Sequence, residues 1–416
     1  MSDKIKIFTI SDHPLSPSGV GSQTKYIIEG MLKTGKYQFV SFGGAIKHHE
    51  HKPQRTEEWG EDWIIWPVDG YGGPDMVRGL LHQQKPDILW FMTDPRFWGW
   101  LWNMENELRS CVPMVYYHVW DNYPYPQFNR DSYLSNDHIA CISKLTHDIV
   151  KTVAPEVESS YIPHAVDSDI FTPLDDAERF RYRQQHALHD KFVCFWNNRN
   201  ARRKQSGSLI WWFKDFLDKV GHDKATLIMH TDVHDEHGQD LEVILKKLGL
   251  ENGEVLFSRQ KVKPEDLAVM YNMADVTINI ADAEGFGLAT LESLSCETPI
   301  MVTMTGGLQD QITDGENWFG VGIEPTSKAI IGSQQVPYIY EDRISKEVFV
   351  NGLLKLYEMG PEGRAELGTA GRKFVKKTFN FETYIKKWDD LFQDVHNKKG
   401  SWSTRTRPTS YEMRTF

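Results

Sequence analysis

Two acidic residues, Glu284 and Glu292, bracket the segment EGFGLATLE. The preceding VTINI is typical of a strand and LATLESLS of a helix, so ADAEGFG is expected to form the loop at the strand's carboxyl end. Gly285 and Gly287 would let backbone amides at the helix N-terminus come close to a phosphate. Carboxylates repel a phosphate, so Glu284 and Glu292 are better suited to accept hydrogen bonds from neutral hydroxyls. Two such acids around a phosphate site describe a sugar nucleotide, but spacing alone favours the simpler alternative of a dipole-favoured Glu284 and a solvated Glu292.

A basic loop, NNRNARRKQ, follows the strand pattern FVCFW and precedes the helix pattern SGSLIWWFKDFL. Arg199 and Lys204 are therefore expected at the carboxyl end of a strand, where a bound diphosphate would need cations. An arginine can bind two phosphate oxygens with its fork, and a lysine acts as a point charge. A solvated basic loop without a ligand is the alternative.

A second glycine-containing turn, SPSGVGSQTKY, follows the first strand. Gly19 and Gly21 permit close backbone approach at the start of a helix. The full G-x-G-x-x-G pattern is missing because Thr24 occupies the place of its third glycine, which disfavours a nicotinamide-linked dehydrogenase.

The elements that must position these loops are short apolar strands alternating with amphipathic helices. The strand patterns before residue 170 are IKIFTI, YQFVSFGG, DILWFM, VPMVYYHVW and HIACIS, and those after it are FVCFWNN, ATLIMHT, EVLFS, VTINI and PIMVT. Apolar strands joined by helical crossovers indicate parallel sheets covered on both faces. The fold class is therefore α/β, with two doubly wound, Rossmann-like domains joined near IPHAVDSDIFTPLDD and followed by helices over residues 344–397.

Four segments are expected along the chain. Residues 1–165 and 166–379 would form the two Rossmann-like domains, and residues 380–397 a helix that packs back on the first. Residues 398–416 contain five basic side chains and no periodicity, so we expect a flexible basic tail, solvated and without a partner.

The composition is that of a folded protein of about two domains: 416 residues, 40% hydrophobic and 25% charged. No apolar run reaches the ~20 residues of a membrane span, and the N-terminus lacks a signal-peptide pattern, so a cytoplasmic protein is expected. The four cysteines are far apart and favour reduced thiols. The net charge of −11 weighs against an evenly basic nucleic-acid-binding surface but allows a local basic groove.

Taken together, these segments resemble the retaining glycosyltransferases of the GT-B fold, glycosyltransferase family 4 (glycosyl transferases group 1). The matching features are the glycine-rich turn after the first strand, HAVDSDIFTP at the domain join, an Arg and a Lys five apart, E-x7-E, and TPIMVTMTGGLQDQITDGEN. The likeness spans about residues 5 to 390. It implies two domains facing each other across a cleft, with the acceptor on the first domain and a UDP- or GDP-linked hexose on the second.

The resemblance also implies residue roles. Glu284 would face the donor sugar and Glu292 the ribose. His118, in YYHVWDNYP, corresponds to a histidine near the sugar, and the acid usually next to it is displaced to Asp121. The diphosphate would be held by residues of both domains: Gly19, Gly21, Arg199, Lys204, Gly285, Phe286, Gly287, Leu288 and Ala289.

Neither a divalent metal nor a cofactor other than the donor is expected, because Arg199, Lys204 and a helix end can supply the positive charge. The segment TDVHDEHGQD contains Asp232, His234, Asp235 and His237, which are potential metal ligands, but such a cluster is typical of a hydrophilic loop.

The sequence allows more than one kind of acceptor. Aromatic stretches such as LWFMTDPRFWGWLW and YYHVWDNYPYPQF could stack on sugar rings or on bases, or could simply pack in the core. A transferase acting on a glycan or glycoconjugate is one hypothesis. A phage-type transferase acting on hydroxylated bases of modified DNA is a second, and a non-catalytic sugar-nucleotide-binding protein is a third.

Overall fold

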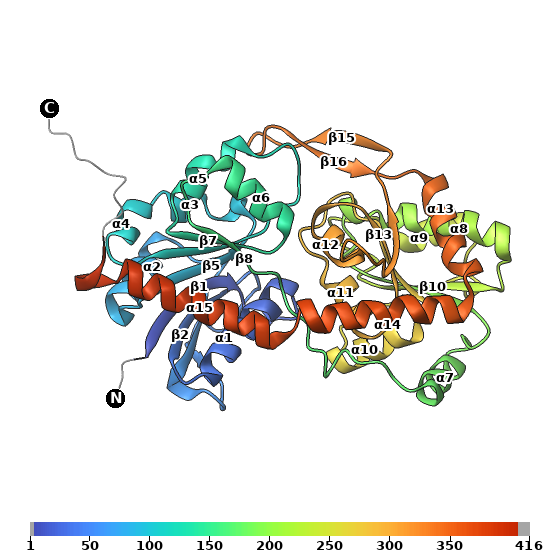
Figure 1. Ribbon diagram of the computed structural model, residues 1–416, viewed down its shortest axis with the longest axis horizontal. Coiled ribbons are helices and arrows are strands. Elements are labelled where there is room, and N and C mark those ends of the chain that lie inside the picture. The colour runs from blue at the N-terminus through green and yellow to red at the C-terminus, as the bar shows by residue number, and fades with distance from the viewer. Residues whose placement is uncertain (1–3, 407–416) are drawn as a thin grey trace.

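A computed structural model of the chain describes residues 4–406 (Figure 1). The first half forms an eight-stranded sheet in the order β3-β4-β2-β1-β5-β6-β7-β8, in which all pairs are parallel except β3 with β4. Its strands are β1 (Ile5–Asp12), β2 (Tyr37–Gly44), β3 (Gln54–Arg55), β4 (Trp63–Pro67), β5 (Ile88–Thr93), β6 (Met114–His118), β7 (His138–Cys141) and β8 (Ser159–Tyr161).

Helices cover both faces of this sheet, as a parallel sheet with apolar strands requires. The first crossover sets the pattern: Ser18 caps helix α1 by accepting a hydrogen bond from the Gly21 amide, and α1 returns the chain to β2. The helices of this half are α1 (Gly19–Lys33), α2 (Pro74–Gln84), α3 (Gly99–Trp102), α4 (Glu105–Arg109), α5 (Arg130–Leu134) and α6 (Lys144–Val153).

The second half contains a six-stranded, all-parallel sheet in the order β11-β10-β9-β12-β13-β14. Its strands are β9 (Phe192–Asn197), β10 (Ala225–His230), β11 (Val255–Ser258), β12 (Val276–Asn279), β13 (Ile300–Thr303) and β14 (Gly320–Ile323). Its helices are α7 (Asp176–Gln185), α8 (Ser206–Val220), α9 (Leu241–Leu248), α10 (Pro264–Met273), α11 (Leu288–Ser295), α12 (Gln309–Ile312), α13 (Lys346–Glu358) and α14 (Gly360–Thr378). The prediction of two doubly wound α/β units is confirmed.

A two-stranded antiparallel hairpin, β15 (Ser327–Ile331) and β16 (Ile339–Arg343), stands outside both sheets. Sequence reasoning missed it, because its strands carry no clean alternation of apolar and polar residues. In Figure 1 the hairpin extends from the second half over to the first.

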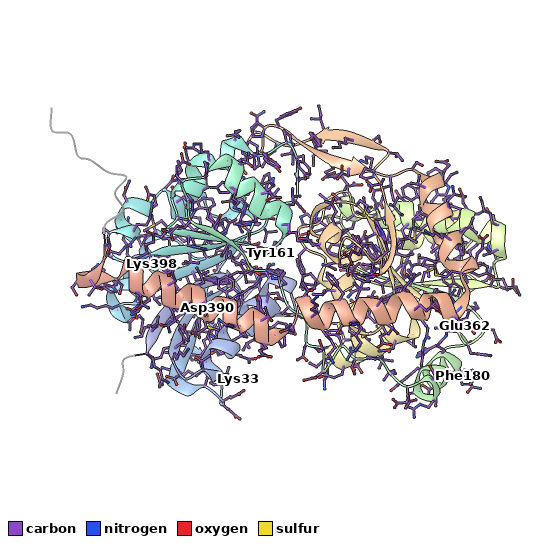
Figure 2. The ribbon with its side chains drawn as sticks, in the orientation of Figure 1. Lys33, Tyr161, Phe180, Glu362, Asp390 and Lys398 are labelled. Atoms are coloured by element: carbon purple, nitrogen blue, oxygen red, sulfur yellow. The ribbon has the colours of Figure 1, made fainter. Side chains whose placement is uncertain are left out.

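The last helix, α15 (Phe381–Lys399), crosses back and lies along the first half (Figure 1). Trp388 is fully buried against the first sheet, and the Tyr37 hydroxyl donates to an Asp389 carboxylate oxygen at 2.6 Å. The outward face of α15 carries Asp390 and Lys398, both labelled in Figure 2, each in an ion pair one helical turn away. Whether residues 1–165 and 166–379 fold as independent units stays a prediction.

The prediction of a flexible tail from residue 398 is wrong for residues 398–406. Lys398 and Lys399 belong to the last turn of α15, and the chain then docks on the first half. Ser401 Oγ donates to Asp87 at 2.7 Å, and Trp402 Nε1 donates to the Pro86 carbonyl at 2.9 Å. Residues 407–416 lie outside the described residues.

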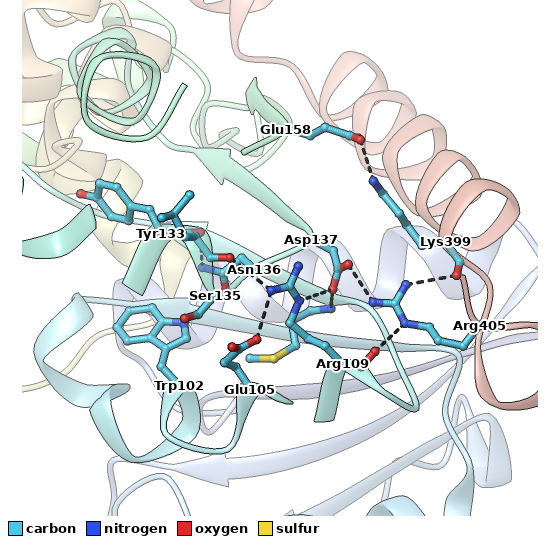
Figure 3. Close-up of polar contacts among 12 residues, drawn as sticks. Trp102, Glu105, Arg109, Tyr133, Ser135, Asn136, Asp137, Glu158, Lys399 and Arg405 are labelled. Carbon is cyan, nitrogen blue, oxygen red and sulfur yellow. Dashed lines mark hydrogen bonds and ion pairs between the residues drawn. The ribbon is translucent and has the colours of Figure 1, made fainter. Parts of the chain in front are cut away.

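The docked segment ends in a buried ionic contact (Figure 3). Arg405 donates to Asp137 at 2.7 Å, and its side chain is 1% exposed. Asp137 also accepts from Arg109 Nε at 3.2 Å and from the Met114 amide at 2.9 Å. A buried carboxylate needs such partners, and a residue about 270 positions away in sequence supplies one of them.

None of the helices within residues 4–406 combines the length and the apolar character needed to cross a membrane.

Candidate active site between the two sheets

A cavity of about 1080 Å³ lies between the carboxyl ends of the two sheets. The first half contributes the start of α1 and the loops after β5 and β6. The second half contributes the loop after β9, the loop before α11, and the β15–β16 hairpin. Ligands of doubly wound sheets bind at this edge, so the cavity is the candidate site.

Glu284 lines this cavity, and Lys204 contacts its carboxylate from just outside the lining. They are 9% and 7% exposed, and the lysine ammonium forms an ion pair with the Glu284 carboxylate. Asn279 Nδ2 donates to the same carboxylate at 3.3 Å. The two sequence-predicted residues are therefore brought together, from the loops after two adjacent strands, β9 and β12.

Each residue of this pair stabilises the ionised form of the other. Burial alone would raise the pKa of Glu284, but the nearby Lys204 and Arg203 hold that pKa below its usual value. Burial lowers the pKa of Lys204, and the Glu284 charge opposes that effect. A fixed carboxylate and a fixed cation thus stand side by side in a region that excludes much of the water.

The backbone between β12 and α11 is shaped by glycines. Gly287 is the N-cap of α11 with a φ of +91°, a conformation that favours glycine. A Cβ on Gly306 would lie 1.9 Å from the Glu284 carbonyl oxygen, and the Gly307 amide donates to that oxygen at 3.0 Å. The paired glycines of MTGGLQDQ therefore allow a second loop to pack directly on the backbone of the Glu284 loop.

Most of the predicted amide-bearing residues line the cavity: Gly285, Phe286, Gly287 and Leu288. Ala289, the second residue of α11, is half-buried and lies outside the lining. The amides at the start of α11 have no partner within the helix, so they suit a phosphate.

Arg199 lines the cavity, but its guanidinium group already binds a carboxylate. Its Nε and Nη2 donate to the two carboxylate oxygens of Asp235 at 2.6 and 3.1 Å, and its side chain is 61% exposed. The hydrogen bond from Arg199 lowers the pKa of Asp235 to about 2. The structure adds two neighbours from the same loop, Arg202 and Arg203, to the lining.

His118 does not lie where the resemblance implies. It is fully buried, with Nε2 at 2.7 Å from the Tyr133 hydroxyl and Nδ1 at 3.1 Å from the Tyr116 hydroxyl. Burial lowers its pKa to about 3, so the ring is neutral. The structure contradicts its placement beside a sugar, because the last residue of β6 turns its side chain into the core. Asp121, three residues further on, lines the cavity instead.

Gly21 also lies outside the cavity. A Cβ there would be 2.6 Å from the His13 carbonyl oxygen, and its amide donates to Ser18. Its role in this structure is to let α1 start against the preceding loop, which corrects the expectation that its amide reaches the diphosphate. Gly19, in contrast, lines the cavity and faces Leu288 across it.

Glu292 lies one turn into α11 and outside the cavity lining. Its carboxylate accepts a hydrogen bond from the Tyr271 hydroxyl at 2.7 Å, and Asn197 Nδ2 donates to that hydroxyl at 2.9 Å. Burial raises the pKa of Glu292 to about 7. The carboxyl group is thus held near the cleft with its charge sensitive to pH.

Sequence reasoning missed several lining residues. Asp94 and Arg96 follow β5 and pair with each other, and His164 lies in the domain join with its ring 4.9 Å from that of Phe286. The rule that ligands bind at strand ends would have drawn attention to Asp94 and Arg96. No local signal marks the lining residues of the hairpin.

Comparison with known proteins agrees with this arrangement. Residues 178–374 match the family model described as Glycosyl transferases group 1. The matched segment, just under half of this chain, is similar to that family. The matched segment contains Arg199, Lys204, Glu284 and Glu292, which are the residues that carried the resemblance.

Curated relatives include mannosylfructose-phosphate synthase from Agrobacterium fabrum, 30% identical over 185 residues, or 43% of this chain and 40% of the relative. D-inositol 3-phosphate glycosyltransferase from Corynebacterium jeikeium is 28% identical over 38% of each chain. Both matches span about two fifths of the relatives' own length. Alpha-galactosylglucosyldiacylglycerol synthase from Streptococcus pneumoniae is 24% identical over 64% of this chain and 69% of the relative.

Solved structures with the same fold cover nearly the whole chain. Sucrose-phosphate synthase from Thermosynechococcus elongatus superposes with a TM-score of 0.74 at 17% identity, over 95% of this chain and 100% of that one. Anabaena HepE in complex with UDP and glucose superposes with a TM-score of 0.68 at 14% identity, over 94% of this chain and 100% of that one. The chain therefore has the GT-B fold.

Proposed function

We propose that the protein is a retaining, metal-independent glycosyltransferase that moves a hexose from a UDP- or GDP-linked donor to a hydroxyl of a glycan or glycoconjugate. The observation that carries this proposal is the buried Glu284–Lys204 pair before α11, whose carboxylate lines the cavity between the two sheets. A carboxylate beside a cation and a row of free amides fits the junction between a sugar and a diphosphate.

The diphosphate end of the donor would lie on the amides that start α11, from Gly285 to Leu288. Arg203 would face it from the loop after β9, with Arg199 at the rim. Lys204, paired with Glu284 just outside the lining, would add its positive charge. Negative charge grows on the departing diphosphate as the glycosidic bond breaks, and fixed cations and amides lower the energy of that state. This supply of positive charge is the reason for proposing a reaction without a metal.

The sugar would lie between Glu284 and Asp121. Glu284, whose pKa is held low, would accept hydrogen bonds from sugar hydroxyls as a carboxylate. Asp121 also lines the cavity, close to the Glu284 loop, and burial raises its pKa. In the reaction the bond from the anomeric carbon to the diphosphate breaks, a bond to the acceptor oxygen forms, and the acceptor proton leaves with the diphosphate. The retaining course rests on the family resemblance.

The ribose would lie beside Glu292, whose carboxylate already accepts a hydrogen bond from the hydroxyl of Tyr271. The same oxygen atoms could accept from ribose hydroxyls.

The relatives named above carry sugar, inositol and glycolipid names, and this favours a carbohydrate-type acceptor over DNA. A cytoplasmic location is part of the proposal, because all four cysteines are free thiols.

The test incubates the purified chain with a panel of UDP- and GDP-linked hexoses and measures the release of nucleoside diphosphate. Glu284→Gln is the site variant, and Glu316→Gln, on an exposed turn, is its matched control. We expect turnover by the wild-type protein and by Glu316→Gln, with a loss of about 10²-fold or more in Glu284→Gln. Binding of a sugar nucleotide by calorimetry without any turnover would instead identify a non-catalytic binding protein.

The stereochemical course is checked separately. Proton NMR of the glycosylated product shows whether the anomeric configuration of the donor is kept. Addition of EDTA is expected to leave the rate unchanged, and inhibition that Mg²⁺ or Mn²⁺ reverses would contradict the metal-independent part of the proposal.

A further inference from the structure

The β15–β16 hairpin joins the two halves of the molecule across the mouth of the cavity. Its base is fixed to the second half: both Glu341 carboxylate oxygens accept from Arg202, at 2.8 and 2.9 Å. Asp342 accepts from the Thr305 hydroxyl at 2.7 Å, and Arg343 forms an ion pair with Asp282. The base therefore moves with the loop that carries Lys204.

The tip of the hairpin is docked on the first half. Val336 and Ile339, which are 4% and 7% exposed, belong to the same apolar cluster as the core of the first sheet. The Tyr340 amide donates to the Tyr123 carbonyl at 2.7 Å, and Asn122 Nδ2 donates to the Tyr340 carbonyl at 3.3 Å. Figure 1 shows the two strands reaching from one half to the other.

The inner side of the hairpin is part of the cavity wall. Ile331, Ser333, Val336 and Ile339 line it, opposite the loops after β5 and β6. Those loops present Asp94, Arg96, Asp121 and Asn122, whose oxygen and nitrogen atoms suit the hydroxyls of a polyol. The hairpin thus forms the part of the cavity wall that borders the loops of the first half.

The enclosed space sets a size limit. Cavities that bury drug-sized ligands measure about 300–1,000 Å³. At about 1080 Å³, the cavity can hold a nucleotide sugar and one further small molecule. On the side of the hairpin, a polymer would have to continue through the place that the docked tip occupies.

We propose that the β15–β16 hairpin is the acceptor-side wall of the site and that it selects small polyhydroxylated acceptors, of the size of a mono- or disaccharide, over polymers. This inference rests on the proposed glycosyl transfer and narrows its acceptor class. An acceptor enters when the tip undocks from the first half, and the redocked tip keeps water and longer chains out.

Two variants distinguish an effect of the cavity wall on acceptor choice from a general loss of folding. Val336→Asp places a charge at the buried tip and undocks it, whereas Ile330→Asp, at a side chain that is 72% exposed and faces outward, is the matched control. Because a buried charge can disturb folding, a second variant replaces residues 332–338 with an Asn-Gly turn, which closes the hairpin without Val336 and the rest of the tip. Circular dichroism and thermal melting check that all three variants are folded.

The measurement uses the sugar nucleotide that the wild-type protein turns over. Free hexoses and disaccharides are compared with a long linear oligosaccharide and with duplex DNA as acceptors, and kcat/KM is measured for each. We expect the wild-type protein and Ile330→Asp to prefer the small acceptor by about tenfold or more, equivalent to about 1.4 kcal/mol. The shortened hairpin should reduce that preference while donor hydrolysis continues.

The outcomes distinguish the two proposals. If no sugar nucleotide is turned over at all, the proposed function fails. If donor turnover is present but the wild-type protein modifies the long oligosaccharide or duplex DNA as well as the small acceptor, the inference about the hairpin is overturned. It is also overturned if the shortened hairpin keeps donor turnover and the full preference for small acceptors.

Discussion

Lys204 and Glu284 lie 80 residues apart in sequence and form a buried ion pair, of which the Glu284 side lines the cavity. Each removes part of the cost of burying the other. A bound diphosphate would share the lysine, and the donor sugar would share the carboxylate. The pair therefore prepares the site for a ligand that is anionic at one end and neutral at the other.

Removing the lysine should weaken catalysis more than binding. In Lys204→Met we expect kcat to fall by about 10²–10³, because a cation aimed at the departing diphosphate is lost. The pKa of Glu284 should rise, since Lys204 helps to hold it low, so the acidic limb of the pH–rate profile moves to higher pH. Diphosphate release measured across pH tests both effects. The control is Lys246→Met on the exposed side of α9, and an unchanged kcat in Lys204→Met would rule out the assigned role.

Arg199→Ala should lower turnover about a hundredfold or more, as expected for the loss of one charged donor to the transition state. The guanidinium lies at the rim of the cavity, where it donates two hydrogen bonds to Asp235. A bound diphosphate would compete with Asp235 for these donors. Steady-state kinetics with the best donor gives the measurement, with Arg181→Ala, an exposed arginine on α7, as the matched control. Near-normal turnover in Arg199→Ala would refute this assignment.

Glu292 predicts a pH dependence of stability. Its pKa is raised by burial from 4.5 to about 7, so folding disfavours the ionised form. Below about pH 4.5 the carboxyl is neutral in both the folded and unfolded states, and the cost of burying its charge grows as pH rises to about 7. Glu292→Gln should therefore gain stability relative to the wild-type protein between pH 5 and pH 8, by at most about 3 kcal/mol.

Urea unfolding of both proteins at several pH values measures that difference. The same variant should bind the nucleoside diphosphate more weakly if the carboxylate contacts the ribose. A stability difference that stays constant from pH 5 to pH 8 would contradict the raised pKa.

Arg405→Ala should destabilise the protein by about 3 kcal/mol, because it leaves the buried Asp137 with one cation fewer. Denaturant unfolding measures the loss, and Lys398→Ala, on the exposed face of α15, is the control. Donor turnover per folded molecule should be unchanged, since Arg405 lies far from the cavity lining. A variant as stable as Lys398→Ala would show that the docked C-terminal segment adds nothing to stability.

The sequence by itself determined the α/β class, the two sheets and the loops that carry chemistry. Apolar runs of strand length and helices of period 3.6 are local patterns, and strand ends in a parallel sheet meet at one edge. For this reason Glu284, Lys204 and the glycines before α11 could be assigned to a common site before any contact was known.

Tertiary structure alone decided which neighbouring residues face that site. His118 ends a strand and turns into the core, while Asp121 lies in the loop that follows, and no local pattern separates the two. The docked tip of the hairpin and the Arg405–Asp137 contact join segments far apart in sequence. Such contacts depend on how complete elements pack, because burial and charge pairing act between whole surfaces rather than along the chain.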